Sequence, residues 1–270
     1  MRKNDYRDRK DYKSDFNAKD NKKNFKSDER VKEPFQKDII YGKNPVFEAL
    51  ESGSSVIKVF TCDPKISSEL KDNKIDVVLL SKDKFFNTYG SNCQNVVAQI
   101  KDFEYYDIDR FLKQNYENSL VLVLDHIEDV GNLGAMLRSA EVFGVDLVII
   151  PDKRSAEINA VAWKTSAGAV NHVKISKVNN LKNALEKLKE KGYWIYGGEA
   201  DSSENIYNID FDQKTVLVIG SEGKGISRLI RESLDFDFFI PMYGKLNSLN
   251  ASVACGVTLS EIRRKIEIKR

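Results

Sequence analysis

The chain has 270 residues, of which 41% are hydrophobic and 31% charged, with a formal net charge of +2; it is long enough for one large domain or two small ones. No apolar run is long enough to cross a membrane, and the first thirty residues lack the apolar core of a signal peptide. The 3 cysteines are far apart and form no C-x-x-C pair, which favours a reducing cytoplasm, and the 2 histidines argue against a metal site or a histidine-relay enzyme.

The first 37 residues differ in composition from the rest. Residues 1–37 contain 13 Lys or Arg and 8 Asp or Glu, very few aliphatic side chains and no helical or strand period. Because such a stretch cannot bury enough apolar surface to offset its ordering entropy, we expect a disordered basic arm. Its aromatic residues interleave with Lys and Arg, which suits base stacking beside phosphate contacts. On this stretch alone, a solubilising tail of mixed charge is the favoured interpretation.

A folded pattern begins at Ile39. Residues 38–51 predict a strand, a turn and a helix that opens near Pro45, a residue favoured in the first helical turn. Short apolar runs rich in β-branched residues predict further strands at 56–61, 76–81 and 95–100. A turn at Pro64 and a polar, helix-like segment separate the first two of these runs. The alternation predicts a small α/β domain over 38–103.

A second domain follows a predicted linker at 104–119, which lacks a strong apolar period. It opens with an apolar strand at 120–125, of the kind buried on both faces. The next helix carries one apolar face, made of Leu133, Met136, Leu137, Ala140 and Phe143. Further strands are predicted at 145–150, 193–198, 215–223 and 236–242, and helices at 183–191, 226–234 and 251–266. We therefore predict an open, mostly parallel α/β sheet over 120–267, with helices on both faces and ligands beyond the carboxyl ends of its strands.

The first of three polar loops at those strand ends is DHIEDVGNLG, residues 125–134. We expect Asn132 at the cap of the following helix, where its side chain can bond backbone N–H groups. Gly134 permits close backbone approach, and Arg138 is expected one turn into the helix. Taken alone, this loop has a simpler interpretation, an ordinary cap and a solvated arginine.

The second and third loops are rich in glycine and in small residues, respectively. Residues 219–227, IGSEGKGIS, form a strand-to-helix turn that can cradle an anion or an adenosine with its backbone amides. The phosphate-loop pattern G-x4-G-K-[ST] is absent, and Glu222 would repel a triphosphate. In the third loop a strand ends at Pro241, and a helix rich in small residues begins around Asn250.

In order and spacing, the three loops resemble the three motifs of the SpoU (TrmH) family of RNA ribose 2'-O-methyltransferases. The resemblance covers about 38–266 and is strongest to the bacterial group that methylates a guanosine ribose of 23S rRNA, whose segment between the first two motifs is similar to residues 151–173. The segment YGKNPVFEALESG resembles the small substrate-binding domain of that group, which has an L30e-like fold. The resemblance implies that the C-terminal domain is a SPOUT-type parallel sheet with a deep trefoil knot.

The resemblance also implies a cofactor, a partner and residue roles. The methyl donor would be S-adenosyl-L-methionine, held mainly by backbone groups of Gly220, Ile240 and Leu249, with Gly198 and Met242 as further contacts. A homodimer would complete the site, because the catalytic Arg138 of one subunit works near the cofactor of the other. The remaining polar positions that match the family are Asn132, Glu222, Ser248 and Asn250. The partners would be RNA and a second copy of the chain, without a metal or a membrane.

Three departures from the family pattern stand out. Val130 replaces a common Pro in the first motif, and Ala251 replaces a common Val in the third. In the small domain the usual His-Gln-Gly reads Cys93-Gln94-Asn95, which weakens any transfer of RNA contacts to this segment. Two alternatives stay open: a tRNA ribose 2'-O-methyltransferase and a catalytically silent RNA-binding relative.

Overall fold

The computed structural model describes residues 39–51, 56–70, 75–101, 103–246 and 248–268. The predicted arm at 1–37 lies outside these residues. Within the described ranges the secondary structure forms a four-stranded and a six-stranded sheet. No helix among them is long and apolar enough to cross a membrane.

The four-stranded sheet belongs to the small domain and has the order β1-β4-β2-β3, with β4 antiparallel to both of its neighbours and β2 parallel to β3. Its strands are β1 (Ile39–Tyr41), β2 (Val56–Thr61), β3 (Asp76–Leu79) and β4 (Val96–Ile100). Its helices are α1 (Lys43–Glu51), α2 (Pro64–Leu70), α3 (Lys82–Tyr89) and the 3-10 turn η2 (Ser91–Cys93). All the predicted strands are present. The prediction omitted α3, because the Ser81 side chain, which caps that helix by accepting from the Lys84 N–H, was assigned to the preceding strand.

The segment Cys93-Gln94-Asn95 has a structural role in this domain. The Gln94 side chain accepts from the Lys43 N–H at 2.8 Å at the start of α1. The Asn95 carbonyl accepts from the Thr61 hydroxyl at 2.7 Å, at the end of β2. Asn95 has a φ of 64°, a left-handed conformation that Gly adopts freely and Asn tolerates better than most residues. Asn95 therefore holds a backbone conformation in which a glycine would also fit.

The six-stranded sheet has the order β10-β8-β9-β5-β6-β7, and every pairing in it is parallel. Its strands are β5 (Ser119–Asp125), β6 (Leu147–Pro151), β7 (Ile175–Val178), β8 (Trp194–Gly198), β9 (Lys214–Gly220) and β10 (Phe236–Phe238). The predicted parallel α/β sheet is thus confirmed. The prediction omitted β7, and β10 is shorter than the predicted strand at 236–242.

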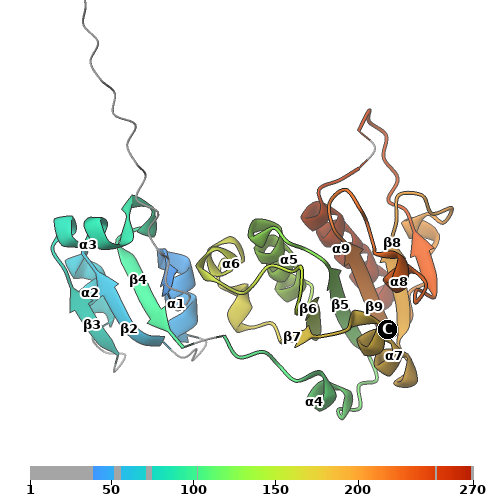
Figure 1. Ribbon diagram of the computed structural model, residues 1–270, viewed down its shortest axis with the longest axis horizontal. Coiled ribbons are helices and arrows are strands. Elements are labelled where there is room, and N and C mark those ends of the chain that lie inside the picture. The colour runs from blue at the N-terminus through green and yellow to red at the C-terminus, as the bar shows by residue number, and fades with distance from the viewer. Residues whose placement is uncertain (1–38, 52–55, 71–74, 102, 247, 269–270) are drawn as a thin grey trace, which may run out of the picture. The chain divides into compact units, whose positions relative to one another are not determined.

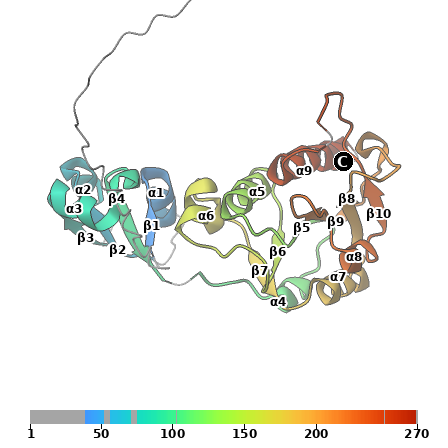
Figure 2. The same ribbon diagram turned by 45° about the horizontal axis from the view of Figure 1, so that its top comes forward.

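Helices cover both faces of this sheet (Figures 1 and 2). They are α4 (Ile108–Leu112), α5 (Val130–Val142), α6 (Ala160–Thr165), α7 (Leu181–Glu190), α8 (Arg228–Arg231) and α9 (Ala251–Ile268), with the 3-10 turns η3 (Ala169–Asn171) and η4 (Ile206–Asn208). Successive side chains of β5 alternate between two cores. Leu122 and Leu124 pack in the core with residues of α5 and α9, while Val121 and Val123 pack in the core with residues of α4, α7 and α8.

The segment predicted as a linker, 104–119, contributes to the second of these cores. Phe111 of α4 is fully buried there and stacks on Tyr116 with ring centroids 4.8 Å apart. The backbone N–H of Tyr106 donates to the Ile175 carbonyl on β7 at 2.7 Å. This segment therefore packs against the large sheet, although its short helix gives no strong periodic signal.

Candidate active site

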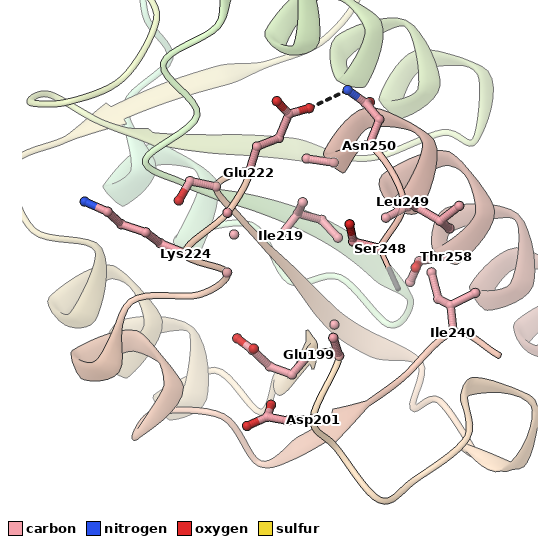
Figure 3. Close-up of a pocket in the computed structure, with 18 of the residues that line it drawn as sticks. Glu199, Asp201, Ile219, Glu222, Lys224, Ile240, Ser248, Leu249, Asn250 and Thr258 are labelled. Atoms are coloured by element: carbon pink, nitrogen blue, oxygen red, sulfur yellow. Dashed lines mark hydrogen bonds between the residues drawn. The ribbon is translucent and has the colours of Figure 1, made fainter. Parts of the chain in front are cut away.

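A cavity of about 810 Å³ opens at the carboxyl ends of β8, β9 and β10, which are neighbours in the sheet (Figure 3). Eight of the ten predicted site residues line it: Gly198, Gly220, Glu222, Ile240, Met242, Ser248, Leu249 and Asn250. Its apolar wall includes Ile219 and Phe238, and its polar wall includes Glu199, Asp201, Lys224 and Arg231. The carboxyl edge of the sheet thus carries the pocket, as the parallel topology predicts.

The glycine-rich second loop folds back tightly on the end of β9. Ser221 and Gly225 exchange two backbone hydrogen bonds, of 3.1 and 3.0 Å, which close the turn around Glu222. A Cβ atom on Gly220 would lie 2.1 Å from the carbonyl carbon of Gly225. The space beside Gly220 is therefore filled by backbone, and only glycine fits there. Asp125, buried at the end of β5, holds the far side of the loop by accepting from the Ser227 N–H at 2.6 Å.

One hydrogen-bond network joins all three predicted loops. The Asn132 side chain donates to Glu222 Oε1 at 3.1 Å, and the Asn250 side chain donates to the same oxygen and to Asn132 Oδ1. Figure 3 shows the contact between Glu222 and Asn250 across the top of the cavity. The Asn250 side chain also caps α9 by accepting from the Ser252 N–H at 2.9 Å. The start of α9 is therefore fixed to the glycine-rich loop.

Two details of the first loop differ from the sequence prediction. The cap of α5 is Asp129, whose carboxylate accepts from the Asn132 N–H at 2.7 Å, so Asn132 lies inside the first turn and does not cap the helix. Either residue type is a good cap, and packing selects Asp129. Val130 occupies the first helical position, where Pro is favoured but not required.

The position of Arg138 also needs correction. Arg138 is the ninth residue of α5 and lies in its third turn, rather than one turn in. Its side chain is exposed, and the structure shows no hydrogen bond or ion pair for it among the described residues. It does not line the cavity. A single chain therefore brings together nine of the predicted residues, eight around the cavity and Asn132 through the network, but not Arg138.

Sequence reasoning missed the charged residues that follow β8. Glu199 accepts from the Ile226 N–H at 3.0 Å through Oε1, and partial burial raises the pKa of its carboxyl group despite that bond and the nearby Arg231. Arg231 donates to Asp201 at 2.7 Å, and this hydrogen bond lowers the pKa of Asp201. Acidic residues directly after a strand that ends at the ligand edge were the available signal.

Gly134, in contrast, behaves as the sequence predicts. A Cβ atom at this position would lie 1.8 Å from the Thr165 hydroxyl oxygen and 3.0 Å from the Ala162 carbonyl oxygen. The glycine thus allows α5 to approach α6 closely.

The cavity fits a nucleoside-like cofactor. Its volume lies within the range usual for small-molecule sites. Gly220 provides a backbone cradle that a Cβ atom would fill, and apolar side chains can cover a base. The carboxylates of the wall can accept hydrogen bonds from the hydroxyl and amino groups of a nucleoside. In the described part of the chain, no group of three His, Cys, Asp or Glu side chains lies close enough to hold a metal ion.

Comparison with known proteins matches each of the two domains to a family model. Residues 119–260 match the family model described as the SpoU rRNA Methylase family, and residues 39–106 match the one described as RNA 2'-O ribose methyltransferase substrate binding. A relative from Staphylococcus saprophyticus, named as a TrmH family tRNA/rRNA methyltransferase, is 42% identical over 237 residues, which are 84% of this chain and 95% of the relative.

Two solved structures show how far the fold is shared. The SpoU methyltransferase AviRb from Streptomyces viridochromogenes, in complex with AdoMet, aligns with a TM-score of 0.74 and 23% identity over 85% of this chain and 90% of that chain. A TrmH/SpoU tRNA modifying enzyme from A. aeolicus aligns with a TM-score of 0.52 and 30% identity, over 60% of this chain and 85% of that chain. The first likeness concerns the fold alone.

Proposed function

The chain belongs to the SpoU (TrmH) family of RNA methyltransferases, which use S-adenosylmethionine as methyl donor, and we propose that it methylates the 2'-hydroxyl of a guanosine ribose in 23S rRNA. The observation that carries this proposal is the cavity at the ends of β8, β9 and β10, closed on one side by the network of Asn132, Glu222 and Asn250. A cofactor pocket and three tied loops at one sheet edge give the arrangement that a methyl transfer to RNA requires.

The chain's own residues hold the cofactor mainly through backbone groups. Gly220, Ile240 and Leu249 contact it in this proposal, with Gly198 and Met242 beside them. When bound, S-adenosylmethionine would supply the electrophilic methyl group that the ribose oxygen accepts. The protein must therefore position the hydroxyl in line with the methyl group and help to remove its proton.

Glu222, Asn132 and Asn250 are positioning residues in this proposal. Their shared hydrogen bonds fix the distance between the first motif and the cofactor loops. Ser248 lines the cavity next to Leu249, where its hydroxyl can orient the third loop or a ribose phosphate. None of these groups needs to change its protonation state.

We propose that Arg138 acts in the pocket of a partner subunit. It is exposed and unpartnered within the described chain, and it lies on α5, the helix whose Asn132 joins the Glu222–Asn250 network. Helices α5 and α9 pack against each other and present exposed valines: Val142 at 65%, Val253 at 49% and Val257 at 38%. Apolar side chains exposed on adjacent helices are typical of an interface, and a homodimer through this face would cover them.

The choice of 23S rRNA rests on the domain organisation. The tRNA modifying enzyme from A. aeolicus aligns with only part of this chain, whereas the chain also matches the substrate-binding family model over 39–106. The proposal includes an L30e-like fold for that domain, a trefoil knot in the segment after β10, the domain limits predicted above, a basic arm at 1–37 and a cytoplasmic location. The three cysteines are buried thiols, which suits that compartment.

Mapping ribose methylation in rRNA and tRNA from cells with and without the gene tests this proposal. We expect one 23S rRNA guanosine to lose its methyl group in the deletion and to regain it with the wild-type gene. Loss at a tRNA position instead would establish the tRNA alternative. Unchanged RNA, together with no S-adenosylmethionine binding by calorimetry, would establish a silent RNA-binding relative.

A further inference from the structure

Glu199 lines the cavity at the end of β8, the middle one of the three strands that form it. It follows β8, which lies between β10 and β9 in the sheet, so the loops that form the two sides of the pocket flank it. Figure 3 shows its side chain at the lower side of the cavity, across from Glu222 and Asn250. An adenosine held by the loops after β9 and β10 must therefore cross the end of β8.

The two carboxylate oxygens of Glu199 have different surroundings. Oε1 accepts from the Ile226 N–H at 3.0 Å, which fixes the side chain against the glycine-rich loop. The structure shows no hydrogen bond to Oε2 among the described residues, although this carboxyl group is partly buried. A partly desolvated acceptor that is held in place and unpartnered is suited to a ligand that donates hydrogen bonds.

The other two carboxylates that line the cavity are already engaged. Asp201 accepts from Arg231 at 2.7 Å, and Glu222 accepts from two asparagine side chains. The donors on the proposed cofactor are the two ribose hydroxyls, the adenine amino group and the ammonium of the amino-acid chain. The ribose joins the adenine to the reacting sulfur, so its vicinal hydroxyls belong at the centre of the pocket, between the base and the Glu222 side.

We propose that Glu199 recognises the ribose of S-adenosylmethionine, with its free Oε2 accepting hydrogen bonds from the 2'- and 3'-hydroxyls. This inference rests on the proposed placement of the cofactor and adds a specificity-determining residue to it. A carboxylate can recognise a ribose diol, because one of its oxygens can accept hydrogen bonds from both hydroxyls. Glu199 is placed for this role at the end of a strand beside a glycine-rich turn.

Calorimetry with the full chain and two stable ligands tests the assignment. S-adenosylhomocysteine carries the ribose and the amino-acid chain, and 5'-methylthioadenosine carries the same ribose without that chain. Glu199→Gln keeps an oxygen for the Ile226 N–H but weakens acceptance from a diol, and we expect it to reduce the affinity for both ligands by the same factor, about tenfold. Asp201→Asn removes the same charge from the same cavity and should change either affinity by less than about twofold.

The ligand offers a second route that does not depend on any variant. The wild-type chain should bind the 2'-deoxy and 3'-deoxy forms of 5'-methylthioadenosine more weakly than the parent compound, and Glu199→Gln should lose most of that preference. Equal wild-type affinity for all three compounds would overturn the proposal.

Three further results would also overturn it. A loss confined to S-adenosylhomocysteine would assign Glu199 to the ammonium group, and an unchanged affinity for both ligands would leave it no role in binding. A fall in the thermal unfolding temperature of the unliganded variant, without loss of the deoxy discrimination, would assign it to support of the loop. If the wild-type chain bound neither ligand, the proposed cofactor site would fail as well.

Discussion

The tight turn at Gly220 gives the sharpest test of the cofactor site. In a Gly220→Ala variant, the new Cβ atom would lie 2.1 Å from the Gly225 carbonyl carbon and 2.2 Å from the Ile226 nitrogen. Both are backbone atoms, so the clash cannot be relieved by rotating a side chain, and the loop from 221 to 226 must move. Gly244→Ala is a control in the loop after β10, because its Cβ atom would meet nothing within 4 Å.

Overpacking of this kind costs about 1–3 kcal/mol, which corresponds to a fall of roughly 5 °C in the unfolding temperature of a domain of this size. We expect Gly220→Ala to bind S-adenosylmethionine at least about thirtyfold more weakly in calorimetry. The displaced loop would lose two backbone hydrogen bonds to the cofactor, which together contribute about 2 kcal/mol. The control should fold normally and lose less than about threefold. Wild-type affinity in Gly220→Ala would refute both the position of the turn and its role as cofactor cradle.

Four other measurements address separate parts of the molecule. Arg138→Ala should slow single-turnover methyl transfer at least about a hundredfold while sparing cofactor affinity and stability, and Arg138→Lys should rescue little because the planar fork is lost; near-native rates would disprove the catalytic assignment. Deleting 1–36 should weaken RNA binding and flatten its dependence on salt, whereas an unaltered slope would support the solubilising-tail interpretation. Burial raises the pKa of Cys255 to about 12, so only about one thiol in ten thousand is ionised at pH 8; rapid labelling of the folded protein at this residue would contradict its burial. A hydrogen bond from Arg264 lowers the pKa of Glu261. Glu261→Gln should therefore be less stable than the wild type at pH 7, and this difference in unfolding free energy should disappear as the pH falls through the lowered pKa. A difference that persists in acid would contradict the pairing.

Five of the six strands of the large sheet could be predicted, because their apolar runs are best buried in the centre of a sheet. Residues 120–125 are apolar on both faces, which fits the centre of a parallel sheet covered by helices on both sides, and β5 occupies that position. The site residues were predicted from the resemblance to the SpoU motifs. Eight of them line one cavity because the parallel sheet brings the ends of β8, β9 and β10 to the same edge.

Short elements and competing caps were harder to predict. The helix α4 has only five residues, and what stabilises it is the burial of Phe111, which no local pattern reveals. In the loop before α5, Asp129 and Asn132 are both suitable caps, and the difference of three residues places Arg138 in the third turn, nearly one turn deeper than predicted. When two nearby residues are equally good caps, tertiary packing decides which one caps the helix, and the local sequence does not reveal that packing.

Glu199 and Arg138 show the two limits of reading a site from one chain. Glu199 takes its role from strand order, since β8 is inserted between β9 and β10 although it precedes both in sequence, and the loops that surround its end come from later in the chain. Arg138 is exposed and unpaired within the described residues, so its surroundings within one chain assign it no task. If Arg138 acts in the pocket of a second copy, the exposed faces of α5 and α9 offer a docking surface, because a copy bound there would bring its own Arg138 along with the interface. Substitutions on this helix face would then test dimerisation and catalysis together. Variants of Val142 or Val253 that separate the subunits should abolish methyl transfer, even though every residue of the cofactor pocket is retained.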